Sequence, residues 1–160
     1  MHNRIPKENN VNYKIIPSCN IIIEQYNGPI LMQDIIDIKK EISIQSNYSP
    51  NFNVIMDFEH SDLVFDSSKL TDYILFANSY NKIYGKRKTA FLTSTPNEVV
   101  LTTIFGLIKG DLPIDSNTFS TFGAIASWFG LSPSEYEQIE SELKKMKNKN
   151  TPNQNTPQEN

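Results

Sequence analysis

The sequence predicts an α/β protein, a sandwich with an opening β-hairpin, βα units, and a mostly parallel central sheet of about five strands with helices packed on it. Two observations carry this prediction. Short runs rich in β-branched and aromatic residues alternate along the chain with segments whose apolar residues recur every three or four positions. The first two of these runs follow each other directly, which is typical of a hairpin.

The hairpin is predicted from residues 13–16 and 21–26, which are separated by a four-residue turn at residues 17–20. Asn27-Gly28-Pro29 is predicted to end the second strand. An amphipathic helix follows, with an inner stripe at spacings of four, three and four: Leu31, Ile35, Ile38 and Ile42. Its charged residues are assigned to the outer side: Asp34, Asp37, Lys39, Lys40 and Glu41.

The middle of the chain is predicted as a buried strand at residues 53–56, an acidic loop at residues 57–66 and a helix at residues 67–84. Gly85 supplies the stop of this helix. The next strand is predicted at residues 89–93.

A strong helix start follows that strand. Thr95 is the expected N-cap, Pro96 takes the first helical position and Glu98 closes a capping box. The helix is predicted to extend to about Lys109, with these residues on its buried face: Val100, Ile104, Leu107 and Ile108.

The last elements are a strand at residues 118–122, a short helix at residues 124–129 and a final helix from Pro133 to about Lys147. The final helix has an apolar stripe only one residue wide: Tyr136, Ile139, Leu143 and Met146. Such a helix is expected at a domain edge or against another chain.

The domain organisation follows from these elements. The globular α/β domain is predicted at residues 12–131 and the amphipathic C-terminal helix at residues 132–147. The polar residues 1–11 and 148–160 offer nothing from which to build a core, so both ends are expected to be disordered.

Composition excludes several classes of function. The chain has 15 Lys and Arg against 18 Asp and Glu, a net charge of −3, which argues against nucleic-acid binding. Its longest apolar stretch, residues 99–108, is too short to span a membrane. Residues 1–7 lack the apolar core of a signal peptide, so a cytoplasmic location is expected. The single cysteine, Cys19, has no partner for an internal disulfide.

The residues needed for catalysis are scarce. His2 and His60 are the two histidines, and the carboxylates around His60 meet none of the usual metal-ligand spacings. The sequence contains no Gly-x-Ser-x-Gly nucleophile motif, phosphate loop or dinucleotide fingerprint. The chain is therefore predicted not to be an enzyme and to hold no metal or cofactor.

Polar residues gather where two predicted parallel strands end. Asp57 and the run Asp66-Ser67-Ser68 follow one strand, and Thr93-Ser94-Thr95 follows the next. Two helix N-termini open there, and their unpaired N–H groups and partial positive charge can hold a phosphate or carboxylate. The alternative is that these hydroxyls and carboxylates only cap their helices.

The segment Val64-Phe65-Asp66-Ser67-Ser68-Lys69-Leu70 resembles the switch segment of the STAS domain family, the anti-sigma-factor antagonists related to SpoIIAA. In that family an apolar-Asp-Ser-Ser/Thr-Gly-Leu-Gly sequence opens the helix after a central strand. Lys69 and Thr71 stand where the family motif has glycines. The order of elements over residues 13–131, the Arg87-Lys88-Thr89-Ala90 pattern and Trp128 are also similar to the SpoIIAA-like group.

The resemblance implies a non-enzymatic regulatory module that contacts a protein partner, with Ser67 as the residue that a partner kinase phosphorylates. The expected contact surface comprises Asp57, Asp66, Ser67 and Ser68, and residues 133–147 offer a contact for a homodimer. The alternative function is binding of a small apolar or anionic ligand, lipid-like or a nucleotide, at the carboxyl ends of the strands. Its candidate residues are Thr93, Ser94 and Thr95.

Overall fold

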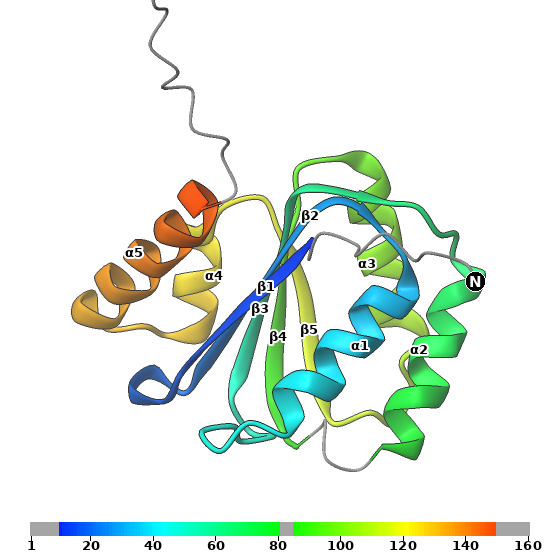
Figure 1. Ribbon diagram of the computed structural model, residues 1–160, viewed down its shortest axis with the longest axis horizontal. Helices are drawn as coiled ribbons and strands as arrows, with labels where there is room; N and C mark the ends of the chain where they lie inside the picture. The colour runs from blue at the N-terminus through cyan, green and yellow to red at the C-terminus, as the bar shows by residue number, and fades with distance from the viewer. Residues whose placement is uncertain (1–9, 81–84, 150–160) are drawn as a thin grey trace, which may run out of the picture.

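The computed structural model of the protein describes residues 10–80 and 85–149. A central sheet lies between two layers of helices, with α1, α2 and α3 on one side and α4 and α5 on the other (Figure 1). The elements in chain order are β1 (Val11–Ile16), η1 (Pro17–Cys19), β2 (Ile21–Ile30), α1 (Met32–Ser43), β3 (Asn53–Leu63), α2 (Ser68–Ser79), β4 (Arg87–Leu92), α3 (Pro96–Ile108), β5 (Ile114–Phe119), α4 (Phe122–Phe129) and α5 (Pro133–Lys149).

The strands of the sheet lie in the order of the sequence, β1-β2-β3-β4-β5. β1 pairs antiparallel with β2, and every later neighbour is parallel. Each parallel step needs a crossover, and right-handed crossovers between sequential strands place α1, α2 and α3 on the same face. The predicted hairpin and mostly parallel sheet of about five strands are confirmed.

Two apolar clusters hold the layers together. Alternate strand residues face opposite sides, so Val54 and Met56 of β3 pack toward α1, α2 and α3, whereas Ile55 packs toward α4 and α5. Ile139 and Leu143 of α5 are buried in the second cluster. The stripe that the sequence placed at a domain edge or against another chain therefore covers one face of the sheet.

β2 and β3 are both longer than predicted. β2 continues through Gly28 and Pro29, which pair with Ser61 and Asp62, and β3 continues to Leu63. The predicted acidic loop at residues 57–66 is therefore wrong over most of its length. The register between β2 and β3 shifts between Asp57 and His60, and the two strands stay paired beyond the shift. The polar residues of this stretch mask the alternation of apolar and polar residues that is typical of a strand.

α3 buries a different face from the predicted one. Its buried residues are Glu98, Leu101, Thr102 and Phe105. Val100 and Leu107, which were expected inside, are 54% and 80% exposed. Because apolar residues surround this helix on every side, its sequence contains no polar stripe that would fix the buried face.

Other boundaries also differ from the prediction: β1 begins at Val11, which was assigned to a disordered end, and β4 begins at Arg87 rather than at residue 89. β5 begins at Ile114 and ends before Thr121, because Thr121 caps α4 and accepts a hydrogen bond from Ala124 N at 3.3 Å. α2 ends at Ser79, and the predicted end of that helix at residue 84 lies outside the described residues. α5 continues to Lys149, so the prediction that residues 148 and 149 are disordered is wrong; residues 1–9 and 150–160, the rest of the predicted disordered ends, lie outside the described residues. None of the helices in the described ranges combines the length and apolar character that crossing a bilayer demands.

Candidate functional site

The predicted contact residues fall on opposite faces of the sheet. Asp57 lies inside β3, is 1% exposed and points toward α5. Asp66, Ser67 and Ser68 are exposed at the start of α2, on the other face. The structure therefore separates Asp57 from the segment around Ser67.

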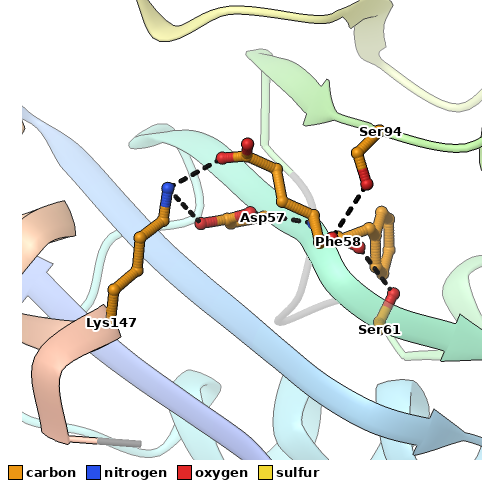
Figure 2. A network of polar contacts seen from close by, with 6 residues as sticks. Asp57, Phe58, Ser61, Ser94 and Lys147 are labelled. Atoms are coloured by element: carbon orange, nitrogen blue, oxygen red, sulfur yellow. Dashed lines mark hydrogen bonds and ion pairs between the residues drawn. The ribbon is translucent and has the colours of Figure 1, made fainter. Parts of the chain in front are cut away.

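Asp57 anchors the end of α5 (Figure 2). Lys147 Nζ lies 2.8 Å from Glu59 Oε1 and 3.9 Å from Asp57 Oδ2. Asp57 Oδ1 accepts a hydrogen bond from Glu59 N at 3.0 Å. Burial raises the pKa of the Asp57 carboxyl, while the Glu59 hydrogen bond and Lys147 oppose this rise. Lys147 was not predicted, because nothing in residue spacing links the last turn of α5 to a strand so far away in sequence.

Asp57→Asn is expected to change how stability depends on pH. Between the unfolded and the raised folded pKa of Asp57, the folded state binds more protons than the unfolded state. The free energy of unfolding of the wild type therefore decreases as pH rises through this window, and the variant lacks this contribution. Urea unfolding between about pH 4 and about pH 7 checks it.

The stability of Asp57→Asn relative to the wild type should increase with pH over this range. Asp62→Asn, at an exposed position of the same strand, is the matched control for removing a carboxylate. A difference between Asp57→Asn and the wild type that stays constant with pH would contradict the burial of a charged Asp57.

The hydroxyl groups at the end of β4 already have partners within the chain. Thr93 Oγ1 donates to Phe119 O at 3.2 Å, and Ser94 Oγ donates to Glu59 O at 2.8 Å (Figure 2 shows Ser94). Thr95 Oγ1 donates to Glu98 Oε2 at 2.5 Å. The hydroxyl groups of the three candidate ligand-binding residues thus make hydrogen bonds that connect the end of β4 to β3, β5 and α3.

The N-terminus of α3 is already occupied by the side chain of Glu98. The carboxylate of Glu98, which is 1% exposed, accepts hydrogen bonds from Ser94 N at 3.2 Å and Thr95 N at 2.7 Å. The predicted capping box is confirmed. A phosphate or carboxylate ligand bound here would have to displace the Glu98 carboxylate.

Ser67 is exposed at the start of α2, and its side chain makes no cap hydrogen bond. Asp66 performs the capping instead, since its Oδ1 accepts from Ser68 N at 2.9 Å and from the Ser68 hydroxyl. The Ser68 hydrogen bonds lower the pKa of the Asp66 carboxyl, which is therefore charged at neutral pH. The Ser67 hydroxyl is left accessible beside a negative charge.

A surface groove of about 410 Å³ runs beside this helix start. Leu31 and Val64 are each 46% exposed along it, although both are large aliphatic residues. The groove is lined by residues of α1, α2 and the segment between β3 and α2: Leu31, Met32, Gln33, Ile36, Val64, Phe65, Asp66, Lys69 and Asp72. It combines an apolar strip with charged groups next to Ser67, as protein-contact surfaces do.

A separate internal cavity lies between the sheet and α1, α2 and α3. Its volume is about 50 Å³, far below the roughly 300–1,000 Å³ of pockets that hold drug-sized ligands. Phe58, Phe91 and Phe105 are among its mostly apolar lining residues. This cavity has no room for a lipid.

A buried ion pair beside this cavity is an unpredicted feature. Lys39 Nζ donates to Glu24 Oε1 at 2.5 Å, and Tyr26 OH donates to Glu24 Oε2 at 2.6 Å. Lys39 was assigned to the outer side of its helix, but it is 4% exposed. Its position four residues after Ile35, on the apolar stripe, was the signal for burial. Burial lowers the pKa of Lys39 to about 8, against the opposing effect of Glu24.

The described residues contain no group of three or more His, Cys, Asp and Glu side chains that could hold a metal ion. No family model matches the chain, and no curated protein matches it either. Among solved structures, the chain is similar to an uncharacterised DUF3478-family protein from Shewanella loihica PV-4, whose description gives a SpoIIAA-like fold. The identity is 11%, the TM-score is 0.49, and the match covers 74% of this chain and 91% of the other.

Proposed function

We propose that this chain is a non-enzymatic regulatory module of the SpoIIAA-like type, which binds a protein partner through the groove beside the start of α2. In this proposal phosphorylation of Ser67 controls the contact. The observation that carries it is the exposure of the Ser67 hydroxyl, without a cap hydrogen bond, next to the apolar strip of Leu31 and Val64.

The electrostatics of the groove support control by a phosphate. A phosphoserine adds about two negative charges at neutral pH. At Ser67 these charges would stand at a helix N-terminus, where the dipole favours them, but next to the ionised Asp66 carboxylate. The phosphate would therefore leave α2 folded and change the charge of the groove that the partner contacts.

The volume of the internal cavity argues against a lipid-like ligand held inside the protein. The groove is open at the surface and measures about 410 Å³, whereas the internal cavity measures about 50 Å³. A protein partner needs an exposed strip of this kind, while a lipid needs an enclosed volume several times larger than the cavity.

Ser67→Glu and Ser67→Ala are expected to capture different amounts of one partner from lysates of the cells that make the protein, with the alanine variant resembling the unmodified wild type. Val64→Glu should reduce capture by about tenfold or more, because it places a charge in the apolar strip. Quantitative mass spectrometry of the captured proteins measures both effects.

Ile44→Glu is the matched control, since Ile44 is 70% exposed at the opposite end of α1 from the groove. Equal capture by the Val64 and Ile44 variants would contradict the location of the contact. Equal capture by the two Ser67 variants would contradict the switch.

A further inference from the structure

α3 exposes an apolar stripe that nothing in the described structure covers. The described residues expose eight large aliphatic side chains, and four of them lie on α3: Val99, Val100, Leu107 and Ile108. Leu107 is 80% exposed. The single ionisable residue of α3, Glu98, is buried at the helix start, so no charge interrupts the stripe. Contiguous exposed apolar surface of this kind marks an interaction site.

β5, next to α3, is an edge strand with an open side. Pro113 O and Phe119 O accept hydrogen bonds from Arg87 N and Thr93 N on the β4 side. By alternation, Ser116 and Thr118 direct their N–H and C=O groups away from the sheet. The outward N–H of Thr118 donates to the Asn117 side chain at 2.9 Å rather than to a strand. This edge can therefore accept another strand.

α3 and β5 are aligned residue by residue. Gly106 approaches Ser116 so closely that a Cβ atom at Gly106 would lie 3.4 Å from Ser116 Oγ. Thr102 Oγ1 and Thr118 Oγ1 form a hydrogen bond of 2.8 Å. Midway between these two contacts, Ile104 of α3 is level with Asn117 of β5. A groove of about 580 Å³ runs along this junction.

We propose that α3 and β5 form the interface of a homodimer, in which β5 pairs antiparallel with β5 of a second copy about a two-fold axis at Asn117. The two sheets then form one continuous sheet. Ser116 and Thr118 exchange backbone hydrogen bonds with Thr118 and Ser116 of the second copy, through the groups that point outward. This inference goes beyond the proposed function and uses none of the groove residues around Val64.

The surface fits a second copy because it is complementary to itself. Of the four exposed residues, Val99 and Leu107 line the groove between α3 and β5 together with Thr103, at intervals of four positions along α3. Since Ile104 is level with the axis, Leu107 of one copy lies between Thr103 and Val99 of the other. Asp115, the charged residue of β5, is opposite Phe119 of the second copy, so no like charges are paired. An isologous contact requires this symmetry.

The opposite edge of the sheet does not offer the same contact. Lys14 of β1 pairs with Glu142 of α5 at 2.8 Å and remains half exposed, which places charge along that edge. Pairing of β1 with β5 would also be heterologous and would generate open filaments. A dimer through β5 avoids the charged edge and closes about a two-fold axis.

Sedimentation velocity over a range of concentrations tests the proposal with the full chain. We expect a concentration-dependent dimer, and Leu107→Glu should raise its dissociation constant about tenfold or more. Ile44→Glu, a change of the same kind at a residue that is 70% exposed elsewhere, should leave the constant unchanged. A monomer at every concentration, or a dimer that is indifferent to Leu107→Glu, overturns the proposal.

Cysteine cross-linking tests the register. Directly opposite residues of a non-hydrogen-bonded antiparallel pair have Cα atoms about 4.5 Å apart, within the range of a disulfide. Asn117→Cys should therefore form a disulfide-linked dimer on mild oxidation. Asp115→Cys should not, since its two copies would be offset by roughly 13 Å along the strands. The wild type, whose Cys19 is buried, is the control. Failure of Asn117→Cys to cross-link overturns the proposed axis.

Discussion

Replacing Lys39 by methionine is expected to lower the free energy of unfolding by about 3–5 kcal/mol. Lys39 and Glu24 are 4% and 1% exposed, and the ammonium donates to the carboxylate at 2.5 Å. Without Lys39 the buried carboxylate loses its hydrogen-bonded ammonium, and the Tyr26 hydroxyl, its other hydrogen-bond partner, is neutral. Urea unfolding at about pH 7, below the pKa of Lys39 of about 8, measures the loss while the wild-type ammonium is charged.

Two further variants test whether the loss of stability arises from the burial of the ion pair. Lys144→Met removes an ion pair with Glu140 at the surface, where Lys144 is 71% exposed, and should cost at most about 1 kcal/mol. The double variant Lys39→Met with Glu24→Leu should recover much of the loss, because it removes both members of the ion pair together. A Lys39→Met cost no larger than that of Lys144→Met would contradict the buried ion pair.

Ile139→Ala is expected to destabilise the protein by about 2–5 kcal/mol. Ile139 of α5 is fully buried in the cluster that includes Ile23 and Ile55 of the sheet, so the truncation leaves a cavity between α5 and the strands. Thermal and urea unfolding followed by circular dichroism measure the change.

Leu75→Ala provides the control, because Leu75 is 64% exposed on α2 and its truncation should change stability by no more than about 0.5 kcal/mol. A similarly small effect for Ile139→Ala would mean that α5 does not pack on the sheet. The Asp57 carboxyl would then also lose the partner that α5 supplies through Lys147.

Sequence reasoning predicted the fold where a local signal was strong. The turn at residues 17–20 and the two β-branched runs beside it gave the hairpin, and Thr95-Pro96-Asn97-Glu98 gave the start of α3 with its capping box. These signals depend on neighbouring residues alone. The parallel direction of the later strands followed because each was separated from the next by a helix-length segment.

The errors arose where the deciding contact is distant in sequence. β3 continues past Asp57 because β2 continues beside it, although residues 59–62 are polar. The buried face of α3 could not be read from a helix that is apolar all round. Burial of Lys39 depends on Glu24, fifteen positions away on another element. In each case a contact with a residue distant in sequence determines the structure, and the local sequence pattern carries no information about that contact.

The candidate site was predicted in part. The exposure of Ser67 and the role of Asp66 as a cap follow from residue types at a helix start. The groove required the structure, since Leu31 and Val64 are more than thirty positions apart and meet through the pairing of β2 with β3. Asp57 was grouped with Ser67 because strand alternation inside the polar stretch was missed.

The central claim, that the groove beside Ser67 contacts a protein partner, is tested most directly by a photo-activated cross-linking amino acid placed at Val64 in the cells that make the protein. We predict one protein adduct from Val64, its loss when Ser67→Glu is added, and no adduct from the same probe at Ile44, which is exposed outside the groove. Equal adducts at both positions, or none at Val64, would contradict the claim.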